Sequence, residues 1–170
     1  MQRKIVMAAL LAAGLGLAGC KTTPKTLPPD PGTGATTTTT MPDTTPGAPV
    51  PGSQEDFLAS VMSDTVYFDT DRFNIDTADM AALQSQAQWL ARYPGKRIII
   101  EGHCDERGTR DYNLALGEKR ANSAKNYLVS IGVDAGRITT VSYGKERPIA
   151  MGSDEASWAK NRRAVTVTVQ

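Results

Sequence analysis

Proline is distributed so unevenly along this chain of 170 residues that it decides where a fold can form. Eight of the ten prolines lie between residues 21 and 53, together with 11 threonines and 4 glycines. A segment of this composition has too few apolar side chains to build a core, and proline favours extended backbone. The sequence therefore predicts a disordered tether over residues 20–53 and one folded domain over residues 54–170.

Residues 1–19 have the pattern of an export signal. Arg3 and Lys4 precede an uncharged, mostly apolar run, which is shorter than the roughly 20 residues that a membrane-spanning helix needs. The run ends in Leu17-Ala18-Gly19-Cys20, which resembles the lipobox of bacterial lipoproteins. This resemblance implies cleavage after Gly19 and lipid on Cys20, and several acyl chains anchor a protein stably where one does not. The alternative is an ordinary signal that ends beside a chance cysteine.

The residue after the lipobox cysteine bears on localisation. In lipoproteins of this kind, aspartate at that position favours retention in the inner membrane. Lys21 occupies it here. The resemblance therefore implies a lipid-anchored protein of the outer membrane whose domain faces the periplasm.

Charge and cysteine content argue against several classes of function. Lys and Arg number 19 and Asp and Glu 18, a net charge of +1, whereas nucleic-acid-binding domains are strongly basic. One histidine and two cysteines do not suffice for a multi-histidine metal site or a zinc site built from cysteines. We therefore expect no nucleic-acid partner, no metal and no cofactor other than the lipid on Cys20.

Beyond residue 53, apolar stretches follow helix and strand periods. Leu83, Ala87 and Leu90 recur at helical spacing, and residues 165–169 alternate strictly between valine and threonine. The uninterrupted run Ile98-Ile99-Ile100 predicts a strand buried on both faces. In chain order, we predict a strand at 66–68, a helix at 76–92, a strand at 98–100, a helix at 111–130 and strands at 138–143 and 165–169. This order predicts an α+β fold, a two-layer sandwich with a mixed βαβαββ-type sheet and both helices on one face.

The second predicted helix has two polar residues, Arg120 and Asn113, on its apolar side. An arginine in that position must find an anion or bear a large desolvation cost. Asp105, in the loop before this helix, is the natural partner. One interpretation is structural: a salt bridge to an internal acid, or an Arg120 side chain that reaches solvent. The other is a zwitterion site, in which Arg120 holds a carboxylate and Asp105 an ammonium.

Several motifs in the predicted domain resemble the OmpA-like peptidoglycan-binding domain family. They are VYFDTD at 66–71, EGHCDERGT at 101–109, YNLALGEKRA at 112–121, VSYGKERP at 141–148 and NRRAV at 161–165. The resemblance implies a peptidoglycan-binding site formed by Asp105, Arg120, Thr109, Asn113, Leu116, Phe68, Asp69 and Thr70. Cys104 departs from the pattern, because that position is often alanine.

The resemblance also implies a function. Domains of this family bind the diaminopimelate stem peptide of peptidoglycan without covalent bonds. Diaminopimelate ends in one amine and one carboxylate, which agrees with the zwitterion site inferred from the charges. Together with the lipobox and the tether, the chain resembles the peptidoglycan-associated lipoproteins. That implies TolB and other Tol proteins as partners, and a role in envelope integrity and in outer-membrane invagination during division.

Two other functions stay open. His103, Cys104 and Asp105 have the residue types of a nucleophilic triad, but neighbours at a strand end point to opposite faces. We therefore expect a binding protein and no enzyme, with a cell-wall hydrolase as one alternative. The other alternative is an envelope lipoprotein that docks proteins without binding the wall, with Arg120 and Asp105 only bridging each other.

Overall fold

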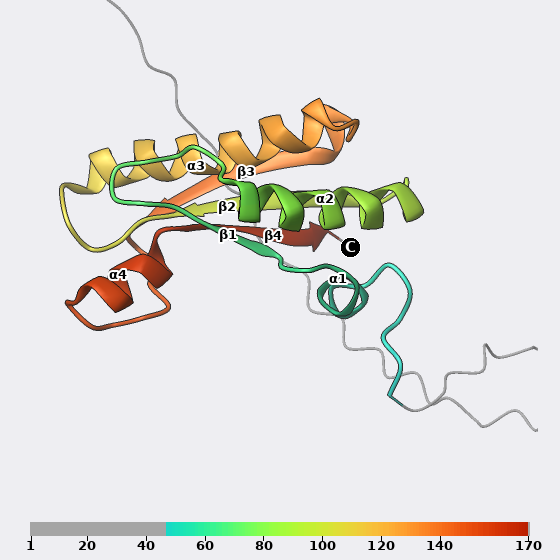
Figure 1. Cartoon of the computed structure of the whole chain (residues 1–170), viewed down its shortest axis with the longest axis horizontal. Coiled ribbons are helices and arrows are strands. Elements are labelled where there is room, and N and C mark those ends of the chain that lie inside the picture. Colours follow the sequence, from blue (N-terminus) through green and yellow to red (C-terminus); the bar gives the residue numbers. More distant parts are fainter. Residues whose placement is uncertain (1–46, 170) are drawn as a thin grey trace, which may run out of the picture. The chain divides into compact units, whose positions relative to one another are not determined.

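The computed structural model describes residues 47–169, which form a sheet with helices packed against it (Figure 1). The predicted signal, Cys20 and most of the tether lie outside the described residues. Within them, no helix is long and apolar enough to cross a membrane. The elements are α1 (Gln54–Ser60), β1 (Thr65–Tyr67), α2 (Thr77–Arg92), β2 (Arg97–His103), α3 (Arg110–Ser130), β3 (Ile138–Gly144), α4 (Glu155–Asn161) and β4 (Arg163–Val169), with a short 3₁₀ helix at Ala135–Arg137.

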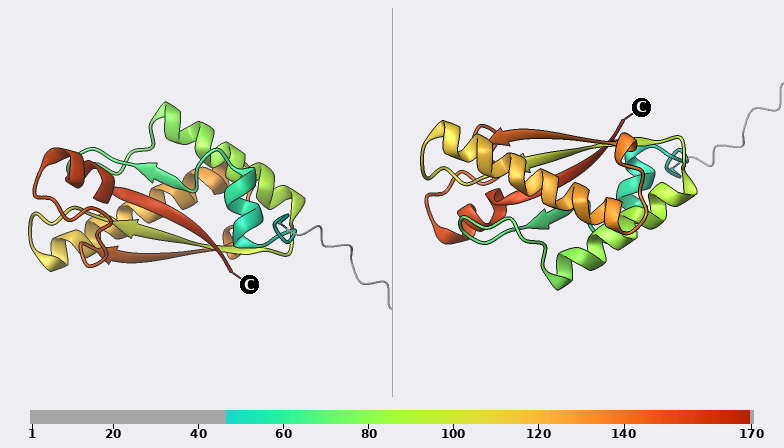
Figure 2. Two further views of the ribbon diagram at one scale, coloured as in Figure 1. Left: turned by 90° about the horizontal axis from the view of Figure 1, so that it is seen from below. Right: turned by 90° about the horizontal axis from the view of Figure 1, so that it is seen from above.

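The sheet has four strands in the order β1-β4-β2-β3. Strand β4 runs antiparallel to both β1 and β2, whereas β2 and β3 are parallel. Helices α2 and α3 lie on the same face of this sheet, as the views from below and above show (Figure 2). The predicted α+β fold with a mixed sheet and both helices on one face is therefore confirmed.

The two long helices begin at side-chain caps. Asp76 accepts a hydrogen bond from the Asp79 amide at 2.8 Å, and Thr109 accepts one from the Tyr112 amide at 3.2 Å. Each cap satisfies an amide that has no partner within its helix. Helix α3 begins one residue before the predicted start. Helices α1 and α4 were not predicted, because seven residues show too little of the helical period.

The prediction that the strand at 98–100 is buried on both faces is wrong, whereas the alternation predicted for 165–169 is observed. Ile98 and Ile100 are completely buried, but Ile99 is only half-buried, because α2 and α3 cover one face of β2. In β4 the alternation is real, yet Thr166 faces the core while the neighbouring valines are half-buried. The Thr166 hydroxyl donates to the side-chain oxygen of Gln86 at 2.8 Å, so burial leaves it paired.

Helix α3 touches β2 at two glycines. A Cβ added to Gly102 would collide with the carbonyl oxygen of Gly117, so neither position has room for a side chain. Asp105 follows Gly102 by three residues, and Arg120 follows Gly117 by three. The glycine contact therefore fixes the spacing between the loop and the helix that carry these two charged residues.

Candidate functional site

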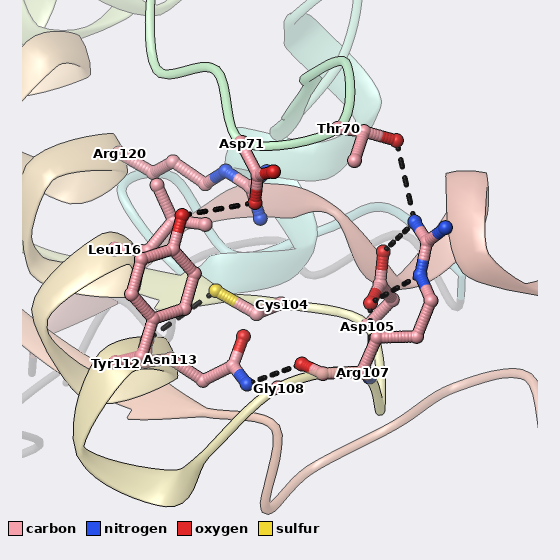
Figure 3. Close-up of a pocket in the computed structure, with 10 residues that line it drawn as sticks. All are labelled: Thr70, Asp71, Cys104, Asp105, Arg107, Gly108, Tyr112, Asn113, Leu116 and Arg120. Carbon is pink, nitrogen blue, oxygen red and sulfur yellow. Dashed lines mark hydrogen bonds and ion pairs between the residues drawn. The ribbon is translucent and has the colours of Figure 1, made fainter.

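A cavity of about 280 Å³ lies where β2 ends and α3 begins (Figure 3). Its walls come from the loop after β1, the loop between β2 and α3, and the first three turns of α3. The lining residues are Thr70, Asp71, Cys104, Asp105, Arg107, Gly108, Tyr112, Asn113, Leu116 and Arg120.

Arg120 is completely buried behind this cavity, and it pairs with main-chain carbonyls. Its Nε donates to Arg72 O at 2.9 Å, Nη1 to His103 O at 2.9 Å and Nη2 to Asp69 O at 3.0 Å. Burial lowers the pKa of Arg120, and the group stays protonated at neutral pH. Among the described residues it makes no ion pair with an acid, so the alternative interpretation, in which Arg120 and Asp105 bridge each other, is wrong. Two of its five N–H groups are left without a partner in these bonds.

Asp105 is paired with two other arginines. Arg107 donates from Nε to Oδ1 at 3.1 Å and from Nη2 to Oδ2 at 2.6 Å, and Arg162 lies 3.5 Å from Oδ2. Burial alone raises the pKa of Asp105, but hydrogen bonds from Arg107 and Arg162 outweigh it, so the pKa lies below its ordinary value. Arg107 is itself held by Trp158, whose ring centroid lies 4.2 Å from the guanidinium carbon.

A second acid, Asp71, lines the opposite wall. Its backbone has φ of 58°, a conformation that non-glycine residues adopt only with strain. The Tyr112 hydroxyl donates to Asp71 Oδ1 at 2.9 Å. This hydrogen bond is the largest cause of the raised pKa of Tyr112. The rest of the Asp71 carboxylate is free to accept hydrogen bonds from a ligand, because no other bond to it occurs among the described residues.

The start of α3 closes the cavity. Gly108 has φ of +83°, which lets the loop turn into the helix. The Asn113 side-chain amide is buried and donates to Arg107 O at 2.6 Å and to Thr109 O at 3.0 Å. This pair of bonds holds the loop against the helix, and the amino end of a long helix also favours an anion.

His103 and Cys104 are neighbours in sequence but face different surroundings. The Cys104 thiol lines the cavity and donates to Asn113 O at 3.3 Å, and burial raises the thiol pKa. The His103 ring instead stacks on Tyr143, with 5.5 Å between ring centroids. In the part of the chain that the structure describes, no group of three or more metal-ligating side chains is placed to hold an ion.

The structure brings most of the predicted site residues together. Asp105, Arg120, Asn113, Leu116 and Thr70 all line the cavity. Thr109 serves as the cap of α3, while Phe68 and Asp69 line a neighbouring groove, although Asp69 contributes its carbonyl to Arg120. Prediction of the site from sequence missed Asp71, Arg107, Gly108 and Tyr112. Of these four, only Arg107 could have been found from the sequence, because it lies two residues after Asp105 in the same loop.

The charges of the cavity balance. Asp71 and Asp105 supply two carboxylates, and Arg107 and Arg120 supply two guanidinium groups. A wall with both signs at fixed positions suits a small ligand that carries both an ammonium and a carboxylate, because each end can find an opposite charge. Tyr112 is half-exposed at the rim, so the cavity opens to solvent beside α3.

Comparison with known proteins decides the family, because the family model for the "OmpA family" matches residues 67–162. The chain belongs to the OmpA family. The match includes every residue that lines the cavity. This OmpA-family chain is also 51% identical over 168 residues to a peptidoglycan-associated lipoprotein of Rhizobium meliloti, covering 97% of this chain and 88% of the relative.

Other members of the OmpA family agree in sequence and in structure. A peptidoglycan-associated lipoprotein of Agrobacterium fabrum is 54% identical over 121 residues, covering 71% of this chain and 68% of the relative. The crystal structure of the peptidoglycan-associated lipoprotein from Burkholderia pseudomallei superposes with a TM-score of 0.62 at 47% identity, covering 66% of this chain and 93% of that one. The likeness to the C-terminal domain of Helicobacter pylori MotB, with a TM-score of 0.59 at 22% identity and covering 63% of this chain and 84% of that one, concerns the fold alone.

Proposed function

We propose that this protein is an outer-membrane lipoprotein that binds the diaminopimelate stem peptide of peptidoglycan reversibly, and so links the membrane to the cell wall. One observation carries the proposal: two acids and two guanidinium groups line a single 280 Å³ cavity. The names of the relatives, which are peptidoglycan-associated lipoproteins, support the same wall component as ligand.

The free end of diaminopimelate carries one carboxylate and one ammonium on the same carbon. Its carboxylate approaches the buried charge of Arg120 and the amino end of α3, where no acid competes for the guanidinium. Its ammonium has two possible acceptors, Asp71 and Asp105. Asp71 is free except for the Tyr112 bond, whereas Asp105 is occupied by Arg107. Lysine lacks the second carboxylate, so the cavity discriminates against lysine-type stem peptides.

The rest of the chain makes this binding a link between layers. Lipid on Cys20 holds the N-terminal end in the outer membrane, and residues 21–53 let the domain search the wall. Tethering keeps the local concentration of the domain at the wall high, so moderate affinity suffices. In this proposal TolB and other Tol proteins are the partners that couple the link to cell division.

The geometry supports binding over hydrolysis. A thiol hydrolase needs a cysteine and a histidine within hydrogen-bond reach. Here the Cys104 thiol donates to Asn113 O, and the His103 ring lies against Tyr143 with a pKa lowered to about 4, mainly by burial and then by Arg163 and Arg147. Such a pair does not produce a thiolate at neutral pH.

Calorimetric titration with a diaminopimelate stem peptide and with its lysine counterpart tests the proposal. We expect saturable binding of the first and at least tenfold weaker binding of the second, because about 1.4 kcal/mol of differential binding corresponds to tenfold. Asp71→Asn and Asp105→Asn should each weaken binding, while Asp134→Asn, an exposed acid near the other end of the sheet, should not. Equal affinity for both peptides would contradict the proposal.

Two further outcomes separate the alternatives. Release of soluble muropeptides from purified peptidoglycan by the wild-type chain would show a hydrolase. A folded chain that binds neither stem peptide nor peptidoglycan would favour a lipoprotein that docks proteins only.

A further inference from the structure

At the end of the sheet opposite the cavity, a groove of about 480 Å³ contains three cations and no acid among its lining residues. It lies where α2 ends, β2 begins and β4 ends, and we name it the basic groove. Its lining residues are Arg92, Tyr93, Pro94, Gly95, Lys96, Arg97 and Val169. We propose that the basic groove docks onto an anionic lipid surface, the same membrane that carries the lipid anchor.

The cations of the groove are available to an external anion. Arg92 and Arg97 are exposed, and Arg92, Lys96 and Arg97 take part in none of the ion pairs among the described residues, while Arg97 donates one hydrogen bond, from Nη2 to Gly136 O at 3.2 Å. The carbonyls at the end of α2 are satisfied from inside by Arg137, whose Nη2 lies 3.0 Å from Leu90 O and 2.8 Å from Tyr93 O. The carbonyls at the end of α2 are therefore not paired with the cations of the groove.

The nearby acids lie outside the lining of the groove, although Asp56 interacts with Tyr93 and its charge acts on Arg92. Asp56 accepts hydrogen bonds from the Gly52 amide at 3.0 Å and from the Trp89 indole at 2.9 Å, and Asp134 accepts one from the Gly136 amide. Glu55 is exposed on α1 and outside the lining. The apolar lining residues, Tyr93, Pro94 and Val169, add surface suited to the glycerol and upper acyl region of a bilayer. This mixture of basic and apolar side chains is typical of interfacial binding.

The described chain also begins beside this groove. Gly52 is buried against it, and a Cβ added there would lie 3.0 Å from Lys96 Cε. Gly47, the first described residue, is separated from Cys20 by 26 residues, and a coil of that length in general spans on the order of 30 Å. A lipid on Cys20 thus keeps a membrane within easy reach of the groove, and weak electrostatic contacts become effective at such a local concentration.

The position of the groove determines which way the cavity would face if the groove contacts a membrane. Strand β2 starts at Arg97 in the groove and ends at His103, directly before the loop that carries Asp105. Seven residues of strand span roughly 23 Å. A domain that rests on lipid through the basic groove therefore presents the zwitterion cavity away from the membrane. The inference rests on the lipid anchor of the proposed function, but it concerns a separate surface and does not depend on which ligand the cavity takes.

Vesicle flotation tests the docking with the unlipidated chain from Lys21 onward. The vesicles are phosphatidylethanolamine with phosphatidylglycerol, compared with phosphatidylcholine alone. We expect binding to the anionic vesicles that falls at least about tenfold in Arg92→Gln/Lys96→Gln/Arg97→Gln, and that disappears at high salt. The matched control, Arg110→Gln/Lys119→Gln/Lys160→Gln, removes the same charge outside the groove and should bind as the parent does.

A peptidoglycan pull-down on the same variants identifies any other occupant. We expect both triple variants to bind the wall as the parent does, so that failure of wall binding and failure of lipid binding are distinguishable. Loss of vesicle binding in both variants would show a general charge effect and overturn the proposal. So would equal binding to neutral vesicles, no vesicle binding by the parent, or loss of wall binding in the groove variant alone.

Discussion

Arg107 donates hydrogen bonds to both carboxylate oxygens of Asp105, from Nε to Oδ1 at 3.1 Å and from Nη2 to Oδ2 at 2.6 Å. The charge of Asp105, in the loop between β2 and α3, is therefore already balanced by a cation of the same loop. Under the proposed function, a ligand ammonium must displace Arg107 or bind to Asp71 on the other wall. The two acids are consequently not equivalent, and their substitution should affect binding to different degrees.

Replacing Arg107 by Gln should raise the pKa of Asp105 toward its ordinary value. Burial raises this pKa, and the hydrogen bonds from Arg107 are the main effect that lowers it. A carboxyl whose pKa is lower in the folded than in the unfolded state stabilises the fold at pH values above its unfolded-state pKa. This stabilisation is lost as the pH falls through the folded-state pKa. We therefore expect the variant to lose stability relative to the parent above about pH 4. Carboxyl ¹³C NMR titration measures the shift. Arg110→Gln, which removes an exposed partner of Glu146, should leave Asp105 unchanged.

Replacing Arg120 by Ala should destabilise the fold by about 3 kcal/mol, because three main-chain carbonyls, one of them buried, lose their donor. Urea unfolding measures the loss. Arg120→Lys keeps the charge but cannot reach all three carbonyls, so we expect a smaller loss of stability and weaker stem-peptide binding. If Arg120→Ala unfolded at the same urea concentration as the parent, the carbonyl bonds would contribute nothing to stability.

Replacing Gly102 by Ala should unfold the domain or cost several kcal/mol, because the new methyl group would collide with the Gly117 carbonyl. Circular dichroism with thermal unfolding measures the effect. Gly95→Ala is the matched control, since an added Cβ there meets no atom within 4 Å. A stable Gly102→Ala variant would mean that α3 can move away from β2, which the close packing of the two elements contradicts.

His103 should make the protein sensitive to mild acid. Its pKa is lowered to about 4, mainly by burial and then by Arg163 and Arg147, while Glu101 lies 3.5 Å from Nε2. The neutral ring is favoured on folding, so its stabilisation is complete above about pH 6.5 and declines as pH falls toward 4. The loss amounts to roughly 3 kcal/mol across that window. Urea unfolding at several pH values should show the decline, and His103→Phe should remove most of it.

The Cys104 thiol should react slowly with maleimide in the folded protein. It is 3% exposed, it donates to Asn113 O, and burial raises its pKa, so little thiolate is present. Mass spectrometry of the adduct over time measures the rate, which should rise steeply in urea. Fast labelling of the folded chain would show that the floor of the cavity opens often.

The fold was predictable because its long elements follow clear periods, and Arg120 was detectable because a charge interrupts the apolar face of α3. Its partners were not predictable, because they are main-chain carbonyls of His103, Asp69 and Arg72, and any residue type supplies a carbonyl. Asp71 was missed for a related reason. Its carboxylate enters the cavity from an irregular loop with positive φ, and no periodic pattern predicts such a conformation.

The position of the cavity and of Gly52 at opposite ends of the sheet has a mechanical consequence. If the chain links membrane and wall as proposed, tension enters near Gly52 and leaves through the bound stem peptide, along the direction of β2. The backbone hydrogen bonds that join β2 to β3 and β4 are then loaded together, in shear. Strands pulled in that direction must lose many bonds at once, whereas strands pulled sideways unzip one bond at a time. Under the proposed function we therefore expect the reversible contact with the wall to yield under load before the domain unfolds.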